Sequence, residues 1–423
     1  MKYKIITLGC KVNQFETQAI QTLLGERGHT QTDRGDAQVV IVNTCAVTKE
    51  SERKSRQALR RLVAENEGAL SAVCGCVSQI APEDIEKLGA DVVYGTNDKL
   101  EFVKAIEKLF AEREKTTCVD IALERQDFEI LPPGAMDGRT RAYIKIQDGC
   151  DNFCAYCVIP FARGAVRSLA PDVAAQQARE LAQQGFFEIV ITGIEISSYG
   201  KDFKTGEDLI SAITAVSKAA PMARIRLGSL ETRVVTEDFC KKLLALQNIC
   251  PHFHLSLQSG SDGVLLRMGR KYDTARFFES VELLRRHFPS CAITTDLIVG
   301  FPGEMQEEFL ETLAFIKKCA FSSMHVFPYS IRPETRAARM ENQISKQVKD
   351  DRAKMARSLA DEMRRDYLKG CVGKTVCVLF ETESSGHAEN YCEVRISESA
   401  LRGEVRSVLI TGTDGERLLG KLN

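Results

Sequence analysis

The 423-residue chain has almost no net charge and no long hydrophobic run, and each absence excludes a class of protein. With 57 basic and 58 acidic side chains its formal net charge is −1, which excludes a cationic protein that binds nucleic acid through its whole surface. No stretch approaches the roughly 18–20 apolar residues of a membrane-spanning helix, and the opening MKYKIITLG is too short and too polar for a signal peptide. We therefore expect a cytoplasmic protein with no membrane partner.

Disulfide bonds are also not expected, although the chain contains 15 cysteines. An odd number of cysteines cannot pair completely, and disulfides rarely persist in a reducing cytosol. We expect metal ligands, catalytic thiols or small buried side chains instead. The useful question is which cysteines have the spacing of ligands.

The length suggests about two to four domains, and the apolar segments indicate an α/β protein. In residues 1–115, short apolar strands alternate with amphipathic helices, which predicts a doubly wound parallel sheet. Residues 116–138 lack periodicity and contain Pro132-Pro133-Gly134, as a linker would. The first region is therefore expected to fold as a separate domain.

The next region predicts a barrel that is two units short of closure. Residues 139–340 contain six strand–helix units, whereas a complete TIM barrel has eight, so a partial (β/α)6 barrel with an open side is the simplest interpretation. A charged connecting helix is expected over residues 341–366. Residues 367–423 alternate apolar and polar side chains, which predicts a small all-β module.

The strongest chemical signal is DGCDNFCAYC, in which Cys150, Cys154 and Cys157 follow the first barrel strand. Catalytic groups of TIM-like barrels lie at this end of the strands. Three thiolates on one loop can bind three irons of a [4Fe–4S] cluster and leave the fourth iron for another ligand. The alternative, a zinc site, needs a fourth Cys or His, and no histidine lies near this loop in the sequence.

This loop, with Tyr156 before its last cysteine, resembles that of the radical S-adenosylmethionine (SAM) enzymes, and two later turns extend the resemblance. TGIE, beginning at Thr192, stands where that superfamily binds the SAM amino group, and DLIVGFPGE, beginning at Asp296, resembles its fifth-strand motif beside the adenine. Each turn alone would also suit an ordinary βα connection with a close backbone approach. The expected SAM-binding residues are Tyr156, Thr192, Gly193, Glu195, Gln258, Ser259, Asp296 and Gly300. Gln258 and Ser259 are chosen only for their position at a strand end.

A second set of cysteines is dispersed, since Cys10, Cys45 and Cys76 each end a different predicted strand of the first domain. In a doubly wound sheet these strand ends share the carboxyl edge, where ligands bind. The three thiols would then converge on a second iron–sulfur cluster, although three buried core cysteines fit the pattern nearly as well. Cys74, two residues before Cys76, competes for the third place.

The whole chain resembles the methylthiotransferases, which combine an N-terminal cluster domain, a radical SAM barrel and a C-terminal TRAM module. Three motifs around the dispersed cysteines carry this resemblance: TLGCKVN, NTCAV and GCVSQ. The segments PFARG and FPYS, with Arg332 and Thr335, also match. The resemblance implies that Cys76, and not Cys74, is the third ligand of an auxiliary [4Fe–4S] cluster.

Within this family, GCKVNQFE resembles the branch that modifies N6-threonylcarbamoyladenosine (t6A) at tRNA position 37. The isopentenyladenosine branch usually has Gln-Met-Asn after the first cysteine, and the ribosomal-protein branch has Pro-Lys-Asn. Two departures leave local contacts open, because Glu195 stands where many relatives have Asn and Glu334 where many have Gly. The expected activity is the conversion of t6A to its 2-methylthio derivative, ms2t6A.

The resemblance implies that SAM is used twice. One SAM methylates a sulfur on the auxiliary cluster, and a second is cleaved at the cluster of Cys150, Cys154 and Cys157 to give a radical that abstracts hydrogen from adenosine C2. The implied cofactors are two [4Fe–4S] clusters and SAM, and the implied partners are a tRNA anticodon loop bearing t6A37 and an electron donor such as flavodoxin or ferredoxin. Position 37 is single-stranded, so exposing the base should cost little.

We expect local basic patches to contribute to tRNA binding alongside residues 367–423, because that module carries slightly more acidic than basic side chains. The denser clusters lie in residues 49–61 and after residue 331. Solvated helix faces would look the same, and core packing would explain Tyr391 as well as stacking on RNA does. The expected RNA contacts are Arg53, Lys54, Arg56, Arg332, Arg336, Arg339 and Tyr391.

The sequence leaves two alternative functions open. A methylthiotransferase of another branch would act on isopentenyladenosine or on a ribosomal protein, which Lys11-Val12-Asn13 disfavours. A non-catalytic, metal-stabilised RNA-binding protein would be colourless with zinc, whereas two clusters hold about eight irons and absorb visible light.

Overall fold

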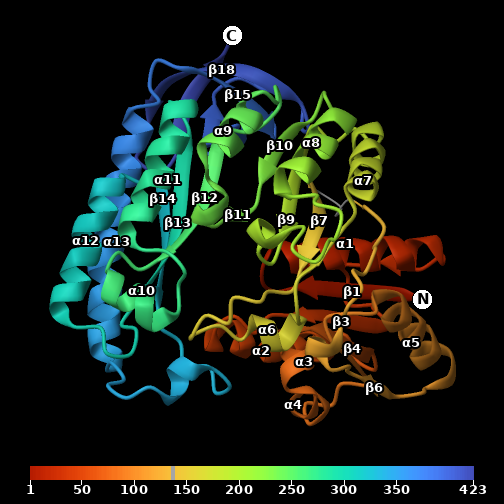
Figure 1. The fold of residues 1–423 in the computed structure, drawn as a ribbon. Coiled ribbons are helices and arrows are strands. Elements are labelled where there is room, and N and C mark those ends of the chain that lie inside the picture. Colours follow the sequence, from red (N-terminus) through yellow and green to blue (C-terminus); the bar gives the residue numbers. More distant parts are fainter. Residues whose placement is uncertain (135–138) are drawn as a thin grey trace.

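The computed structural model describes residues 1–134 and 139–423 and consists of three parts in chain order (Figure 1). A parallel-sheet domain comes first, a half-barrel follows, and a small closed barrel ends the chain. No described helix is long and apolar enough to cross a membrane.

The first domain is a doubly wound sheet, as predicted. All six strands are parallel, in the order β2-β1-β3-β4-β5-β6. Its elements are β1 (Lys2–Thr7), α1 (Lys11–Glu26), β2 (Thr30–Gln31), β3 (Val39–Thr44), α2 (Lys49–Glu65), β4 (Leu70–Gly75), α3 (Cys76–Ile80), α4 (Pro82–Glu86), β5 (Val92–Tyr94), α5 (Lys99–Glu112) and β6 (Thr116–Cys118).

Both faces of this sheet are covered, which explains its uninterrupted apolar strands. Every residue of β3 is buried. Val39 and Ile41 pack in the core that contains α1 and α5, whereas Val40 and Val42 pack in the core that contains α2. The period of two along the strand thus divides its side chains between two helical layers.

The expected linker is partly structured. Thr116–Cys118 pairs with β5 as the edge strand of the first sheet, and Ala122–Glu124 forms a 3-10 turn, η1. Leu131 is buried, and its carbonyl oxygen accepts a hydrogen bond from Gln177 at 2.9 Å. Residues 135–138 of the expected linker lie outside the described residues.

The second part is the partial (β/α)6 barrel that the sequence predicts. Its six expected strands are present, divided between sheets of order β10-β9-β7-β8 and β11-β12-β13-β14. The third expected strand contributes to both sheets, because Gly228 separates β10 from β11. The elements are β7 (Ala142–Asp148), α6 (Ile159–Arg163), β8 (Arg167–Ser168), α7 (Pro171–Gln183), β9 (Glu188–Gly193), η2 (Ile196–Ser198), α8 (Leu209–Ala219), β10 (Arg224–Leu227), β11 (Ser229–Leu230), η3 (Thr232–Val234), α9 (Glu237–Leu244), β12 (His252–Gln258), α10 (Asp262–Met268), α11 (Thr274–His287), β13 (Ala292–Val299), α12 (Gln306–Cys319) and β14 (Ser323–Pro328).

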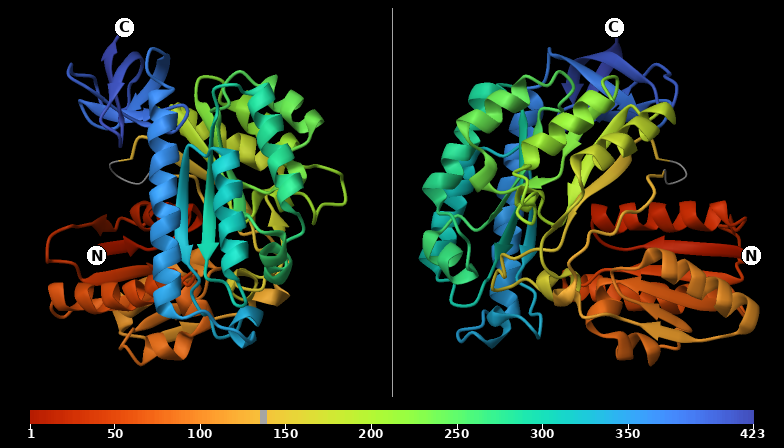
Figure 2. Two further views of the ribbon diagram at one scale, coloured as in Figure 1. Left: turned by 90° about the vertical axis from the view of Figure 1, so that its left-hand side faces the viewer. Right: turned by 45° about the vertical axis from the view of Figure 1, so that its right-hand side comes forward.

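The connecting helix α13 (Lys346–Lys369) follows the short η4 (Arg336–Arg339) and runs along the outside of the half-barrel to the last part (Figure 2). That part is the predicted all-β module, a closed barrel of order β15-β16-β17-β19-β18. Its strands are β15 (Thr375–Phe380), β16 (Ser385–Ala388), β17 (Glu393–Ile396), β18 (Val405–Thr413) and β19 (Leu418–Leu422). The first domain and this barrel lie at different ends of the half-barrel (Figure 1).

Candidate active site

The compact cysteine set occupies the loop between β7 and α6. The backbone N–H of Cys157 donates to the carbonyl oxygen of Cys154 at 2.9 Å. Gly149 has φ +73°, and a Cβ there would lie 1.8 Å from the carbonyl oxygen of Ala165, so only glycine permits this approach. Burial raises the pKa of the Cys150 and Cys157 thiols to about 12. A metal or a positive charge is therefore needed to keep these sulfurs as thiolates.

Arg270 supplies such a charge, and sequence reasoning missed it. Its Nη1 donates to Cys154 Sγ at 3.2 Å and its Nη2 donates to Glu231 Oε1 at 2.7 Å. Glu231 follows β11 directly and also pairs with Arg233 at 3.2 Å. The position of Glu231 at a barrel strand end was a usable signal, but no sequence pattern places Arg270 beside a cysteine.

The predicted turn after β9 lies beside the same loop. The Gln147 amide nitrogen donates to the carbonyl oxygens of Asp148 and Gly149 at 2.8 and 2.7 Å, while its Oε1 accepts from the backbone N–H of Glu195 at 2.7 Å. A Cβ on Gly193 would lie 2.9 Å from the Gln147 carbonyl oxygen. One glutamine thus joins the turn to the segment that carries Cys150.

Glu195 has one carboxylate oxygen engaged and one without a partner. Its Oε2 accepts from Arg233 Nη2 at 2.5 Å and from Ser198, whereas Oε1 is buried with no hydrogen-bond partner among the described residues. Burial, and then the charge of Glu231, raises the pKa of Glu195. Thr192, also predicted here, is buried within β9. A buried carboxylate oxygen that lacks a donor suits an ammonium group, such as the one SAM would bring to this turn.

The predicted residues on β12 and β13 fall into two groups. Asp296 and Gln258 are only partly buried; Asp296 Oδ2 lies 3.4 Å from His254 Nε2, and Gln258 has φ +70°. Ser259 is buried, and its hydroxyl lies 3.3 Å from that of Thr312 on α12. The Ser259 side chain therefore joins a strand to a helix, and its contact with SAM stays a prediction.

Gly300 and Tyr156, the remaining predicted SAM contacts, lie on neighbouring segments. Gly300 has φ +70°, and a Cβ there would lie 2.4 Å from Cγ of Lys349 on α13. Tyr156 packs edge-on against Phe301, the residue after Gly300, with ring centroids 6.5 Å apart. The fifth-strand motif therefore packs against the aromatic residue of the cysteine loop.

The dispersed cysteines lie at three neighbouring strand ends. Cys10 is the N-cap of α1, Cys45 follows β3, and Cys76 begins α3. Asn13 Oδ1 accepts from the Cys10 thiol at 3.4 Å, and its Nδ2 donates to the carbonyl oxygen of Thr44 at 2.8 Å. The Thr44 hydroxyl accepts from the backbone N–H that follows Cys76, at 3.1 Å. Two polar side chains thus fasten the three cysteine segments together.

Cys74 and Cys76 belong to different layers of the first domain. Cys74 packs in the core that contains Phe102 of α5, whereas Cys76 packs in the core that contains Val158, just before α6. Burial raises the pKa of the Cys76 thiol to about 12, while the charge of Arg163 acts to lower it. Only Cys76 therefore faces the half-barrel, which supports the family-based choice of ligand.

The cysteines of each set do not surround one common centre in the described part of the chain. Within residues 1–134 and 139–423, no three His, Cys, Asp or Glu side chains are grouped so that they could hold one metal ion. A four-iron cluster binds each cysteine through a different iron, so its ligands need no common centre. Two sets of three free thiols, without histidine, suit such clusters.

Several basic residues of α2 form ion pairs, although the helix has more basic than acidic side chains. Arg53 donates to Glu50 at 2.7 Å, and Lys54 lies 3.9 Å from the same carboxylate. Arg56 pairs with Glu52 at 2.5 Å, and Arg332, only 5% exposed, pairs with Glu52 at 2.6 Å. Arg332 therefore joins the first domain to the half-barrel instead of facing RNA, a correction that sequence charge counting could not anticipate.

Arg336 and Arg339 differ from those residues. Both are exposed in η4, and neither forms an ion pair among the described residues. The backbone N–H of Ala337 between them donates to the carbonyl oxygen of Ala155 in the cysteine loop at 2.8 Å. These two cations therefore lie beside the candidate site, where an anionic RNA backbone would meet them.

Tyr391 lies at the joint between the small barrel and the half-barrel. Its ring centroid is 5.0 Å from that of His252 and 5.1 Å from that of His387, and it packs 4.7 Å from the Arg226 guanidinium. Its hydroxyl accepts from Arg141 at 3.2 Å. The ring thus contacts the protein on several sides while 39% of the residue stays exposed, and its stacking on RNA stays a prediction.

Lys11, the residue after Cys10, is an unpaired cation at the domain boundary. Burial and the positive charges of Arg226 and Arg141 lower the pKa of Lys11, and the charge of Lys11 contributes to lowering the pKa of Asp296. These effects place its ammonium group within electrostatic range of the half-barrel interior. In the described part of the chain, it has neither an ion pair nor a hydrogen bond.

Comparisons with known proteins match both cysteine-bearing parts. The radical SAM superfamily model matches residues 144–316, and the uncharacterized protein family UPF0004 matches residues 2–95. The chain is 39% identical to the threonylcarbamoyladenosine tRNA methylthiotransferase MtaB of Bacillus subtilis, over 92% of this chain and 88% of that one. It is 36% identical to the enzyme of the same name from Thermotoga maritima, over 98% and 96%. A tRNA-2-methylthio-N(6)-dimethylallyladenosine synthase of Pelotomaculum thermopropionicum is 31% identical over 100% and 98%.

Solved structures agree in fold. The radical SAM methyltransferase TsrM from Kitasatospora setae aligns with a TM-score of 0.58 and 16% identity, over 80% of this chain and 75% of that one. The cobalamin-dependent radical SAM enzyme OxsB aligns with a TM-score of 0.55 and 10% identity, over 85% and 56%. With two cysteine sets in place and curated relatives matched over nearly its full length, the chain belongs to the radical SAM methylthiotransferase family.

Proposed function

We propose that this enzyme transfers a methylthio group to C2 of t6A at position 37 of tRNA. The observation that carries the proposal is the placement of both cysteine sets at the contact between the first domain and the half-barrel, in a chain that matches t6A-modifying relatives almost end to end. What we propose beyond family membership is the identity of the modified base, t6A, and its position in the tRNA, 37.

SAM and [4Fe–4S] clusters are the cofactors of this family. We assign Cys150, Cys154 and Cys157 to one cluster, with its fourth iron available to SAM, and Cys10, Cys45 and Cys76 to the second. When bound, these groups supply the electron, the hydrogen-abstracting radical and the methylated sulfur. The protein has to bind, orient and shield them.

Polar residues around the compact loop are suited to that task. The Arg270 guanidinium donates to Cys154 Sγ and stabilises a thiolate there. Glu195 Oε1, buried and without a donor, would accept a hydrogen bond from the SAM ammonium. Glu231 holds Arg270 and Arg233 in place from the other side. The departure from Asn at position 195 therefore keeps an acceptor in the turn and adds a negative charge.

Lys11 supports t6A as the base. The threonylcarbamoyl group ends in a carboxylate, whereas an isopentenyl group is apolar. An unpaired, half-buried ammonium group whose pKa is lowered by burial, Arg226 and Arg141 would gain from an anionic partner. We therefore assign the substrate carboxylate to the vicinity of Lys11.

The RNA itself would contact the exposed face around the compact loop. Arg336 and Arg339 are the unpaired cations there, and we propose that they bind phosphates of the anticodon loop. The small C-terminal barrel, with its TRAM-like position in the chain, is proposed to bind the tRNA body. A flavodoxin or ferredoxin of the cytoplasm would supply the electrons.

A reconstitution experiment tests the proposal. The anaerobically iron- and sulfide-loaded enzyme is incubated with SAM, a reductant and an anticodon stem–loop carrying either t6A or isopentenyladenosine, and the nucleosides are identified by mass spectrometry. We expect ms2t6A only. Methylthiolation of isopentenyladenosine alone would make the base assignment wrong, and SAM cleavage without any methylthio product on either RNA would make the tRNA assignment wrong.

A further inference from the structure

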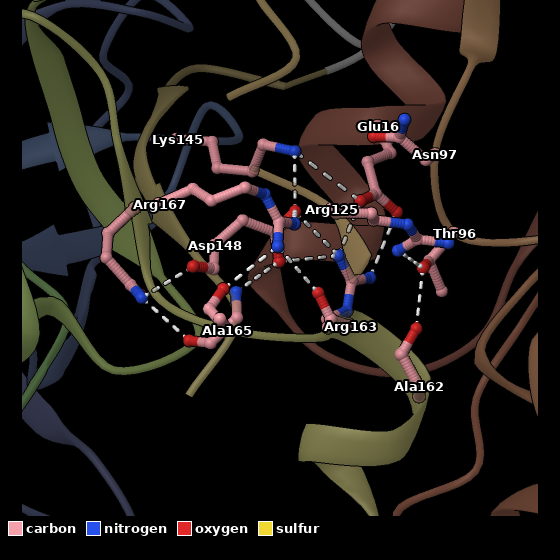
Figure 3. A network of polar contacts seen from close by, with 12 residues as sticks. Glu16, Thr96, Asn97, Arg125, Lys145, Asp148, Ala162, Arg163, Ala165 and Arg167 are labelled. Atoms are coloured by element: carbon pink, nitrogen blue, oxygen red, sulfur yellow. Dashed lines mark hydrogen bonds and ion pairs between the residues drawn. The ribbon is translucent and has the colours of Figure 1, made fainter. Parts of the chain in front are cut away.

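The two cysteine sets are connected through one buried guanidinium, that of Arg163 (Figure 3). Arg163 ends α6, the helix that follows the compact loop, and is 0% exposed. Its Nη1 and Nη2 donate to the two carboxylate oxygens of Glu16 at 2.7 and 3.1 Å. The same Nη1 also lies 3.2 Å from both carboxylate oxygens of Asp148. One side chain thus contacts both domains.

On the first-domain side, the contacts of Arg163 lead directly to the dispersed cysteines. Nη2 donates to Asn13 Oδ1 at 3.2 Å, and the same oxygen accepts from the Cys10 thiol at 3.4 Å. Asn13 also holds the carbonyl oxygen of Thr44, the residue before Cys45. Arg163 is therefore one hydrogen-bonded residue away from Cys10.

On the half-barrel side, the contacts lead to the compact loop. Asp148 stands two residues before Cys150, and its Oδ1 accepts from the backbone N–H of Gly149 at 2.8 Å. Its Oδ2 accepts from Lys145 at 2.9 Å, and Lys145 also lies 3.7 Å from Glu16. In Figure 3 these side chains converge from α1 and β7 onto Arg163.

The network is charged and almost fully buried, which makes its geometry demanding. Burial alone would raise the pKa of Glu16, but Arg163 and Lys99 lower it overall, so Glu16 is ionised. Charges removed from water are stable only when their partners are well placed and their hydrogen bonds are complete. Both Nη atoms of Arg163 have partners, and these partners come from both domains, whereas its Nε has none among the described residues. The network therefore depends on the relative arrangement of the two domains.

We propose that Arg163 is a positioning residue that sets the separation and orientation of the two cysteine sets, and thereby couples SAM cleavage at one set to methylthio transfer from the other. The inference rests on the proposed function, because it assumes that both sets hold clusters. A displacement of about 1 Å between reacting groups costs on the order of 100-fold in rate. Loosening the network should therefore uncouple the two events before it abolishes either one.

The test uses the loaded enzyme with Arg163→Lys. Lysine keeps the positive charge but cannot serve Asn13, Glu16 and Asp148 together, because it lacks the planar fork of donors. We expect both clusters to be retained, a changed magnetic interaction between the reduced clusters in the electron paramagnetic resonance spectrum, and a rise of about 10-fold or more in 5′-deoxyadenosine formed per methylthiolated base. In the cluster-free protein, hydrogen exchange should become faster in both α1 and α6.

Arg224→Lys is the control, since Arg224 forms a largely buried ion pair with Glu188 at 2.6 Å and touches neither cysteine set. It should change neither the product ratio nor the magnetic interaction. Glu16→Gln is a second variant, which keeps the side-chain shape while removing a charge, and it should uncouple in the same direction as Arg163→Lys.

Two results would overturn the proposal. One is a wild-type product ratio and magnetic interaction in both network variants; the other is loss of both clusters in both variants, which would make the network only structural. Neither result is confused with failure of the proposed function, because that failure would already appear as the absence of ms2t6A with the wild-type enzyme.

Discussion

The compact and the dispersed cysteine sets are built on different principles. Cys150, Cys154 and Cys157 lie on one loop, and a short stretch of backbone limits how far apart their sulfurs can be. Cys10, Cys45 and Cys76 share no local constraint, and only the parallel pairing of β1, β3 and β4 brings their segments together. A compact set is thus a property of the sequence, whereas a dispersed set is a property of the fold.

Glycine allows a close backbone approach near both cysteine sets, but between different kinds of segment. Gly149 lets the compact loop turn back on its own domain. Gly9 lets one strand end approach another: its φ is +109°, and a Cβ there would lie 2.8 Å from that of Cys45. The dispersed set therefore depends on close backbone approach between separate segments, and its assembly should be more sensitive to changes in domain packing.

The largest effect should come from removing ligands of each set. Cys157→Ser should lose about four of about eight irons and abolish SAM cleavage and methylthio transfer together. Cys76→Ser should also lose about four irons but retain SAM cleavage. Iron analysis and 5′-deoxyadenosine assays check both. Cys74→Ser is the matched control with full iron content, and loss of half the iron in that variant instead would exchange the roles of Cys74 and Cys76.

The stabilisation that the ion pair between Glu16 and Arg163 provides should decrease at acidic pH. The folded-state pKa of Glu16 is lowered, chiefly by Arg163 acting against burial, so its stabilising effect is present above the ordinary glutamate pKa of about 4.3 and is lost as pH falls through the folded value. Glu16→Gln should cost about 3–5 kcal/mol at pH 7, and this difference from wild type should shrink below about pH 4. Denaturant unfolding of the cluster-free proteins measures it; a difference that stays constant with pH would contradict the assignment.

A substitution of Lys11 tests whether the region around the dispersed cysteines binds the substrate or has only a structural role. If it meets the carboxylate of t6A, Lys11→Gln should weaken use of the t6A stem–loop by about 10–100-fold, as expected for loss of about 1.5–3 kcal/mol from a charged hydrogen bond. SAM cleavage without RNA should be unchanged. The measurement is kcat/KM with t6A and with unmodified adenosine, and an equal loss for the two RNAs would refute the role.

The smallest effect concerns the basic patches near the two sets. Replacing both Arg336 and Arg339 by Glu should weaken tRNA binding and reduce the salt slope by about 1.4, since each lost phosphate contact with a single strand changes it by about 0.7. Replacing Arg53 and Lys54 by Glu should change it less, because both already share an ion pair with Glu50. Titrations of tRNA at several salt concentrations measure both effects. A larger effect of the Arg53 and Lys54 substitutions would indicate that the RNA binds along α2 instead.

Much of the fold could be predicted because its signals are local. An uninterrupted apolar run such as β3 predicts a strand that is buried on both faces. The alternation of apolar strands with amphipathic helices predicts the six strand–helix units of the half-barrel. The edge strand β6 was missed because three residues carry too little pattern, and its pairing with β5 is a tertiary fact. Candidate site residues could be proposed from the sequence where they are contiguous, as in the cysteine loop and the turn at Gly193, because there the spacing itself carries the signal.

Long side chains were harder to assign than cysteines. Arg332 and Tyr391 have the residue types of RNA contacts, but one is buried against Glu52 and the other is packed between histidines and arginines. Arg270 has no recognisable motif, yet it reaches Cys154. The same guanidinium serves phosphate, carboxylate or thiolate equally well, so its partner depends on what the fold places within its reach.

The sequence by itself determined the compact cysteine loop, the α/β class and the family, because ligand spacing and apolar periodicity are carried by residue type and order. Only the tertiary structure decided that Cys76 faces the half-barrel, that the α2 cations are mostly paired, and that Arg163 joins Glu16 to Asp148. The physical reason is that hydrogen bonds and ion pairs act over a few ångströms, and such distances between remote segments exist only after the chain has folded.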